Sequence, residues 1–178
     1  MSTLIPRQPV PELKIDTLDD GVWQLAERKT ENFTLIVFYR GWHCPICGPY
    51  LRDLDRKLAE FSQRGIDVIA ISSDDHSRAQ AAREGWKIKQ LTLGYGMSIE
   101  QGRQWGLFVS SGIGSTSVGV DEPELFFEPG LFLVRADRTL YFSAVQTMPF
   151  ARPAFDEILK ALDFIISRNY PARGEAVS

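Results

Sequence analysis

The run at residues 33–39, FTLIVFY, restricts the fold of this chain more than any other segment. It is short, apolar, and rich in β-branched and aromatic residues, and polar residues and a glycine flank it. This pattern is typical of a β-strand that is buried on both faces. Because such strands occur in sheets that helices cover on both sides, we expect residues 33–39 to form a central strand of an α/β domain.

The remaining pattern alternates between helical and extended segments. Apolar residues at helical spacing, from Leu51 to Phe61, predict an amphipathic helix that ends near Gly65. An order of strand, helix, strand, helix, hairpin and helix predicts an α/β sandwich with a mixed sheet. The expected elements are a helix at 46–64, a strand at 66–73, a helix at 76–85, a short strand or turn at 91–96, a weak helix at 98–106, a loop at 110–130, a hairpin at 130–145 and a helix around 155–165.

Composition limits the function classes. The 178 residues suit one domain, 1–178, with a flexible tail at about 171–178. A formal net charge of −3 with no basic block argues against a nucleic-acid partner, and no apolar run is long enough to span a membrane. The first residues lack the pattern of a secretory signal, so we expect the protein to be cytoplasmic.

The only two cysteines, Cys44 and Cys47, directly follow the expected strand at 33–39. The carboxyl end of a central strand is where chemistry usually occurs in open α/β sheets. A thiol reacts as its thiolate, and a helix N-terminus lowers the pKa of a nearby thiol. We therefore expect Cys44 to attack and Cys47 to resolve, with Arg40 and His43 adding positive charge.

Two other interpretations of the cysteines stay open. Free cysteines are often buried as small hydrophobic residues. Alternatively, Cys44, Cys47, His43 and His76, the only cysteines and histidines of the chain, could bind zinc or another soft metal. A single CxxC is half of the usual zinc signal, which weakens this hypothesis.

Longer segments resemble a known family. The order strand, CxxC, helix resembles the thioredoxin fold, and TLIVFYRGWHCP, IDVIAISSDDHSRAQAAREG and PGLFLVRADRTLYFSA resemble the peroxiredoxin-like alkyl hydroperoxide reductase/thiol-specific antioxidant family. The resemblance covers about residues 6–168. It implies an α/β, thioredoxin-like (peroxiredoxin-type) three-layer sandwich, with a central mixed β-sheet flanked by helices.

The chain departs from that family at the peroxide site. Val37 and Gly41 stand where the family has a proline and a threonine, and Pro129 stands where it has an arginine. By the resemblance, Cys44 is the peroxidatic position, but the groups that activate a peroxide are missing. Thioredoxins have a cis-proline just before the equivalent strand, facing the CxxC, so the resemblance implies a cis bond before Pro129.

Other residues near the cysteines have two interpretations each. Trp42 and Tyr39 are candidate docking aromatics, although Tyr39 could equally pack in the core, and His43 either tunes Cys44 or bonds locally. Asp74, Asp75 and His76 predict a turn and a helix N-cap, or a functional cluster. Arg152 precedes the last helix, at a place where the family also has an arginine, and we expect it at the surface or in an interface.

The sequence therefore predicts a redox-active thiol–disulfide oxidoreductase that cycles Cys44 and Cys47 without a cofactor. Its site would comprise Cys44, Cys47, Pro129, His43 and Trp42, and an external thiol would supply electrons. One alternative is an antioxidant thiol peroxidase, in which a Cys44 sulfenic acid is resolved by Cys47. The other is a metal-binding module. We expect thiol or disulfide substrates. Hydroperoxides are the alternative substrates, and a homodimer is the assembly considered.

Overall fold

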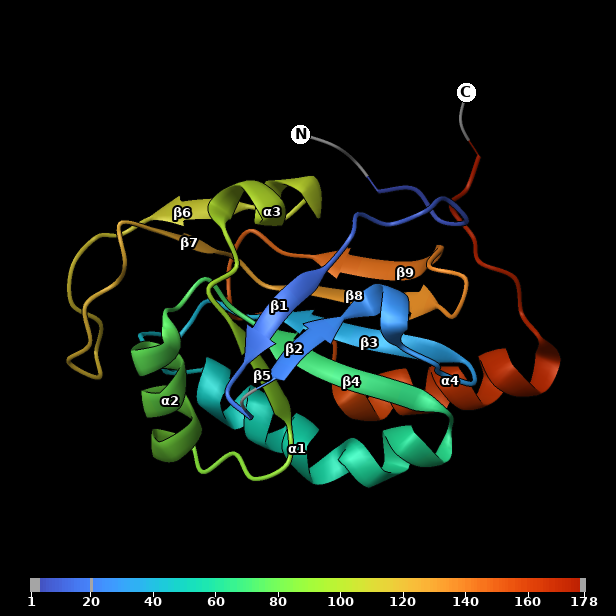
Figure 1. Cartoon of the computed structure of the whole chain (residues 1–178), viewed down its shortest axis with the longest axis horizontal. Helices are drawn as coiled ribbons and strands as arrows, with labels where there is room; N and C mark the ends of the chain where they lie inside the picture. Colours follow the sequence, from blue (N-terminus) through green and yellow to red (C-terminus); the bar gives the residue numbers. More distant parts are fainter. Residues whose placement is uncertain (1–3, 20, 177–178) are drawn as a thin grey trace.

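A mixed seven-stranded sheet forms the centre of the computed structural model, which describes residues 4–19 and 21–176 (Figure 1). The strand order is β2-β1-β5-β4-β3-β8-β9, in which β3, β4 and β5 are parallel and the other pairs are antiparallel. The strands are β1 (Lys14–Thr17), β2 (Gly21–Gln24), β3 (Phe33–Phe38), β4 (Ile66–Ile71), β5 (Thr92–Tyr95), β8 (Gly130–Arg135) and β9 (Leu140–Val145).

Helices cover both faces of the sheet. The helices α1 (Cys47–Gln63), α2 (His76–Gly85) and α4 (Phe155–Arg168) lie on one face. The short helix α3 (Ile99–Gln104) lies on the other face, while a 3-10 turn at Leu25–Glu27 follows β2 (Figure 1). The predicted three-layer α/β sandwich is therefore confirmed, and the predicted interior strand is β3.

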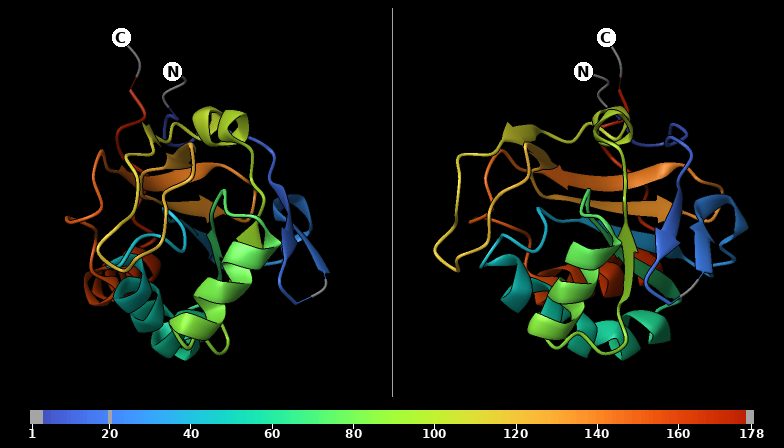
Figure 2. Two further views of the ribbon diagram at one scale, coloured as in Figure 1. Left: turned by 90° about the vertical axis from the view of Figure 1, so that its left-hand side faces the viewer. Right: turned by 60° about the vertical axis from the view of Figure 1, so that its left-hand side comes forward.

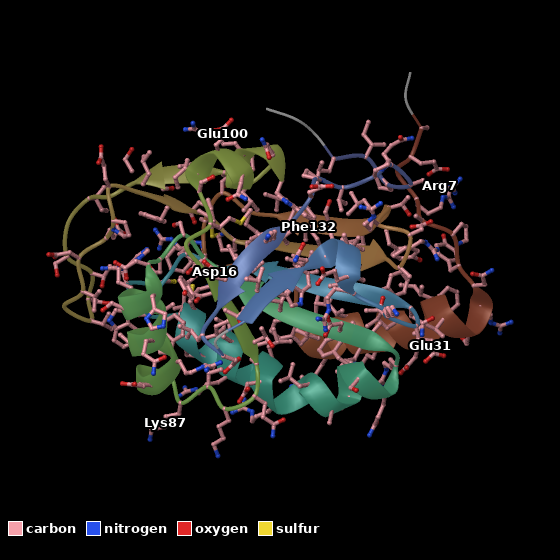
Figure 3. All side chains as sticks on the ribbon, viewed as in Figure 1. Arg7, Asp16, Glu31, Lys87, Glu100 and Phe132 are labelled. Carbon is pink, nitrogen blue, oxygen red and sulfur yellow. The ribbon has the colours of Figure 1, made fainter. Side chains whose placement is uncertain are left out.

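The sequence of β3 explains its place in the sheet. All six of its residues are buried, and their side chains alternate between two cores. Leu35 and Val37 pack toward α1 and α4, whereas Ile36 and Phe38 pack toward Trp105 on the opposite face. Phe132 of β8, labelled in Figure 3, belongs to that second core. A polar group buried at these positions loses its contact with water, which is why five of the six residues are apolar and Thr34 is the exception.

Two elements differ from the sequence-based expectation. The helix α1 begins at Cys47 rather than at residue 46, so Cys44 lies in the turn before it. The segment expected to be a loop contains a second small sheet of β6 (Val109–Ser111) and β7 (Leu125–Phe127). These three-residue strands are too short to give a recognisable alternation, and a tertiary contact, the burial of Phe126 and Phe127, stabilises them.

The two terminal segments meet. Residues 171–176 form no helix or strand, but Ala172 is buried and its carbonyl accepts two hydrogen bonds from the Arg7 guanidinium, at 2.8 and 3.0 Å. Residues 177 and 178 of the expected tail lie outside the described residues. Within 4–19 and 21–176, every helix is too short or too polar to cross a bilayer.

Candidate active site

The cysteines lie in a turn between the end of β3 and the start of α1. The strands β3 and β4 run toward the same end of the sheet, where α2 begins and the loop between β6 and β7 projects; the left-hand view of Figure 2 faces this end. The backbone N–H of Cys44 donates to the Gly41 carbonyl at 3.1 Å, and that of Cys47 donates to the Cys44 carbonyl at 3.2 Å. These two tight turns bring both side chains to the same place.

Cys44 and Cys47 form a reduced pair in direct contact. Both are free thiols, both are fully buried, and their Sγ atoms lie 2.7 Å apart, with the Cys47 thiol donating to Cys44. Solvent reaches neither thiol. The arrangement suits oxidation to a disulfide, since the second sulfur already contacts the first.

The surroundings shift the pKa values of the two thiols in opposite directions. The hydrogen bond from Cys47 lowers the pKa of Cys44 to about 6, and the positive charges of Arg152 and Arg40 act in the same direction against the effect of burial. Burial raises the pKa of Cys47 well above its ordinary value, and the hydrogen bond to Cys44 acts in the same direction. This asymmetry favours Cys44 as the thiolate and therefore as the attacking group.

Arg152 lies at the dithiol, and the expectation of a surface or interface role was wrong. Its Nη2 atom is 3.3 Å from Cys47 Sγ and 4.0 Å from Cys44 Sγ. Its Nε donates to the Pro149 carbonyl at 2.9 Å, and its guanidinium stacks 4.6 Å from the ring of Tyr50. No motif around the CxxC points to this residue, because it comes from the segment between β9 and α4.

Tyr50 supports Arg152 from the first turn of α1. Its hydroxyl donates to the Pro153 carbonyl at 2.7 Å, so the stacking partner of the guanidinium also fixes the backbone that follows it. The ring of Phe155 lies 4.4 Å from that of Tyr50. The cation is thus positioned by α1 and by the start of α4 together.

A second arginine, Arg40, is neutralised by two carboxylates. It lies 3.4 Å from Glu122 and 3.4 Å from Glu128, and its guanidinium stacks 4.6 Å from the ring of Phe126. Glu128 is buried and accepts a hydrogen bond of 2.6 Å from Ser110 Oγ. The pairing reduces the positive charge that Arg40 offers to Cys44, so Arg152 is the stronger cation at the site.

His43 is buried beside Cys44 and carries no charge at neutral pH. Burial lowers the pKa of His43 to about 4, and Arg40 and Arg78 add to this shift. Its ring lies 4.5 Å from that of Phe126, and neither ring nitrogen has a hydrogen-bond partner within the described residues. The expectation that His43 adds positive charge to the site was therefore wrong. Burial penalises the charged imidazolium, and the nearby arginines repel it rather than stabilise it.

The segment before Cys44 is fixed by Asp74, which follows β4. The backbone N–H of Trp42 donates to the buried Asp74 carboxylate at 2.7 Å, and Arg78 Nε donates to it at 3.0 Å. Burial nevertheless raises the pKa of Asp74 above its ordinary value. Gly41 has φ +132°, and a Cβ there would lie 2.7 Å from the Asp74 carboxylate, so this position requires glycine.

The remaining predicted residues have simpler surroundings. The Trp42 ring is half-buried against Trp86, with ring centroids 5.6 Å apart, and Tyr39 is fully buried in the core. Asp75 accepts a hydrogen bond from the Arg78 N–H at 2.8 Å and is the N-cap of α2, as predicted. Pro129 is buried before β8, and its carbonyl accepts from the Gln146 N–H, but the expected cis bond is wrong, because all described peptide bonds are trans.

The described residues contain no ligand cluster that supports the metal-site hypothesis. No group of three or more histidine, cysteine, aspartate or glutamate side chains within the described residues is arranged to hold a metal ion. The His76 ring packs edge-on against Tyr95, and the His43 ring packs on Phe126. The four residues considered for the site therefore do not converge.

Fold and site together define a thioredoxin-fold thiol protein of the peroxiredoxin type. The AhpC/TSA family matches residues 6–143, and the chain belongs to this family as a thiol-based redox protein. A search of the curated proteins finds no match.

Solved peroxiredoxins share the fold at low sequence identity. Peroxidoxin BcpB from Mycobacterium tuberculosis is 15% identical with a TM-score of 0.69, and the match covers 92% of this chain and 99% of that one. A cysteine-to-serine mutant of peroxiredoxin 6 from Arenicola marina is 16% identical (TM-score 0.74; 94% and 76%). The reduced 2-Cys peroxiredoxin from Plasmodium vivax is 17% identical (TM-score 0.74; 94% and 84%).

Proposed function

We propose that this protein is a thiol peroxidase that reduces hydroperoxides through Cys44 and Cys47. Family membership favours this function over the thiol–disulfide oxidoreductase that the CxxC alone suggested. The observation that carries the proposal is the position of Arg152. Its guanidinium, 3.3 Å from Cys47 Sγ, brings a positive charge to the dithiol although position 129 is a proline.

Arg152 has an unpaired N–H donor that is available to a substrate. Its Nη1 atom is buried and has no hydrogen-bond partner within the described residues. A buried N–H without a partner is costly, and an oxygen of a bound hydroperoxide would satisfy it. The positive charge would also stabilise the alkoxide or hydroxide that develops as the O–O bond breaks.

The reaction proceeds in two steps at the paired sulfurs. The Cys44 thiolate attacks one peroxide oxygen, the O–O bond breaks, and the leaving oxygen takes up a proton, which leaves Cys44 as a sulfenic acid. The sulfur of Cys47 then attacks that of Cys44, a disulfide forms, and water leaves. Because the Sγ atoms are already 2.7 Å apart, the second step needs little rearrangement of α1.

Burial of the dithiol also supports a small oxidant. Both cysteines are 0% exposed, and the Arg152 guanidinium lies 3.3 Å from Cys47 Sγ. A hydroperoxide needs only a narrow approach, whereas a disulfide in a protein needs an exposed sulfur. An external thiol is still required to reduce the Cys44–Cys47 disulfide, since the chain has no third cysteine.

The test is the rate at which the reduced protein is oxidised, followed by stopped-flow tryptophan fluorescence. Hydrogen peroxide and a small disulfide are compared, with Trp42 beside Cys44 as the reporter. We expect rapid oxidation by peroxide, none in Cys44→Ser, and a sulfenic acid that a dimedone probe traps in Cys47→Ser. Slow oxidation by peroxide together with fast exchange with the disulfide would reject the peroxidase in favour of a disulfide reductase.

A further inference from the structure

The Arg152 guanidinium lies nearer to the neutral thiol of the pair than to the thiolate. Its Nη2 atom is 3.3 Å from Cys47 Sγ but 4.0 Å from Cys44 Sγ. In the reduced protein the negative charge belongs to Cys44, because the pKa of Cys44 falls to about 6 while burial raises that of Cys47. A cation that served only the Cys44 thiolate would lie nearest to that sulfur. The observed position suits a negative charge that develops on Cys47 during the reaction.

The thiol proton of Cys47 already points at the reacting sulfur. Cys47 Sγ donates a hydrogen bond to Cys44 Sγ, and the two atoms are 2.7 Å apart. Within the described residues, Arg152 is the other side chain that donates to Cys44 Sγ. An oxygen that leaves beside Cys44 therefore meets one thiol proton and one guanidinium.

Other sources of a proton are poor at this position. Both sulfurs are 0% exposed, so bulk water does not reach them. A guanidinium does not release a proton at neutral pH. His43, the neighbour of Cys44 in the chain, has a pKa of about 4 and carries no imidazolium proton to give.

The Cys47 thiol becomes a stronger acid as the O–O bond breaks. Its hydrogen bond to Cys44 contributes to its raised pKa, and this contribution disappears as the Cys44 thiolate is consumed. The oxygen that leaves is strongly basic, since water has a pKa of about 15.7. A proton donor that strengthens while its acceptor gains charge meets the requirement for general acid catalysis.

We propose that Cys47 is the acid of the peroxide step as well as the resolving thiol. Its proton passes to the oxygen that leaves the peroxide, and Arg152 stabilises the Cys47 thiolate that results. This role rests on the proposed function, because it supplies the proton that the first step of the peroxidase requires.

The sequence of steps balances in atoms and charge. The Cys44 thiolate forms a bond to the outer oxygen, the O–O bond breaks, and its electron pair stays on the leaving oxygen, which takes the Cys47 proton and departs as water or an alcohol. The peroxide gains the two electrons that Cys44 loses in becoming a sulfenic acid. The Cys47 thiolate then attacks Cys44 Sγ, the disulfide forms, and hydroxide leaves and takes a proton from the solvent.

The experiment compares two oxidants that differ in their need for a proton. Hydrogen peroxide releases hydroxide, whereas peracetic acid transfers the same oxygen and releases acetate, a weak base that needs no proton. Single-turnover oxidation of Cys44 at pH 7 is followed in the wild type, Cys47→Ala, Cys47→Ser and Leu51→Val by mass spectrometry after quenching with iodoacetamide. The result is the rate with hydrogen peroxide divided by the rate with peracetic acid. A change in the thiolate fraction of Cys44 slows both oxidants equally and cancels in this ratio.

The variants have distinct expected ratios. We expect the ratio to fall about a hundredfold in Cys47→Ala, which has no proton to transfer. Cys47→Ser keeps a hydroxyl donor at this place and should recover part of the ratio. Leu51, which is buried one helical turn from Cys47 in the same core, is the matched control, and Leu51→Val should leave the ratio unchanged. An unchanged ratio in Cys47→Ala, or an equal fall in Leu51→Val, would overturn the acid role.

The wild-type rate with hydrogen peroxide separates this role from the peroxidase itself. A slow rate would reject the peroxidase, while a ratio that falls in Cys47→Ala would still support proton transfer from Cys47. A fast rate with an unchanged ratio in Cys47→Ala would keep the peroxidase and reject Cys47 as its acid.

Discussion

The Nη2 atom of Arg152 lies 3.3 Å from the Sγ of Cys47, although 105 positions separate the two residues in the chain. Neither residue indicates this contact in the sequence, because the pairing depends on where α4 packs against α1. It places a full positive charge at a dithiol that is closed to solvent. In such a low-dielectric setting, one charge has a large effect on the thiolate.

Replacing Arg152 tests the importance of that charge. We expect Arg152→Gln to slow oxidation by hydrogen peroxide at pH 7 by about tenfold or more, since both the thiolate and the leaving oxygen lose a cation. Arg152→Lys should recover only part of the rate, because an ammonium lacks the planar set of donors. Arg56→Gln on the exposed face of α1 is the control, and a loss of rate equal to that of Arg152→Gln in this variant would contradict the prediction.

The pH profile of Cys44 follows from its lowered pKa. A thiol with a pKa of about 6 is mostly thiolate at pH 7, so its alkylation rate should rise between pH 5 and 7 and then level off. Iodoacetamide alkylation of the reduced protein measures this, with Cys47→Ala reporting on Cys44 without its hydrogen-bond donor. Because the Cys47 thiol supplies the largest lowering effect, the midpoint in Cys47→Ala should move to higher pH. A midpoint that stays near 6 would assign the shift to the arginines instead.

His43 should make the folded protein less stable in acid. The pKa of His43 is about 4 in the folded state, against an ordinary value of 6.5. Between pH 4 and pH 6.5 the imidazole therefore binds a proton in the unfolded chain but not in the folded protein. The penalty is absent above pH 6.5 and grows as the pH falls toward 4. In His43→Phe, the loss of unfolding free energy between pH 7 and pH 4.5 should be smaller by about 2 kcal/mol. Urea denaturation at both values measures this, and an identical pH dependence in variant and wild type would refute it.

The contact between Asp74 and Trp42 should hold the reactive turn. Asp74→Ala leaves the Trp42 N–H without its acceptor, and we expect a loss of unfolding free energy of about 1–3 kcal/mol. Gly41→Ala should be destabilising as well, because its φ of +132° and the nearby carboxylate exclude a Cβ. Asp75→Ala, which removes only the N-cap of α2, is the matched control and should cost about 1 kcal/mol. Thermal or urea unfolding compares them; an Asp74→Ala loss no larger than that of the control would count against this role.

Most of the sheet could be predicted because burial on both faces leaves a clear mark on the residues. The run at β3 is apolar except for Thr34, and the apolar spacing of α1 matches its buried residues Leu51, Leu54 and Phe61. The strands β6 and β7 could not be predicted, because three residues are too few to show an alternating apolar pattern. Their pairing depends on Phe126 and Phe127 filling space beneath them, which is a property of the packed core.

The sequence by itself determined the α/β sandwich, the edge of the sheet where the site lies, and the pair Cys44 and Cys47, since periodicity and a local motif are written in neighbouring residues. Only the tertiary structure decided which groups surround that pair. It brought Arg152 to the sulfurs, buried His43 as a neutral ring, and tied Trp42 to Asp74. These relationships join residues far apart in the chain, and the desolvation that sets their charges exists only once the core has closed around them.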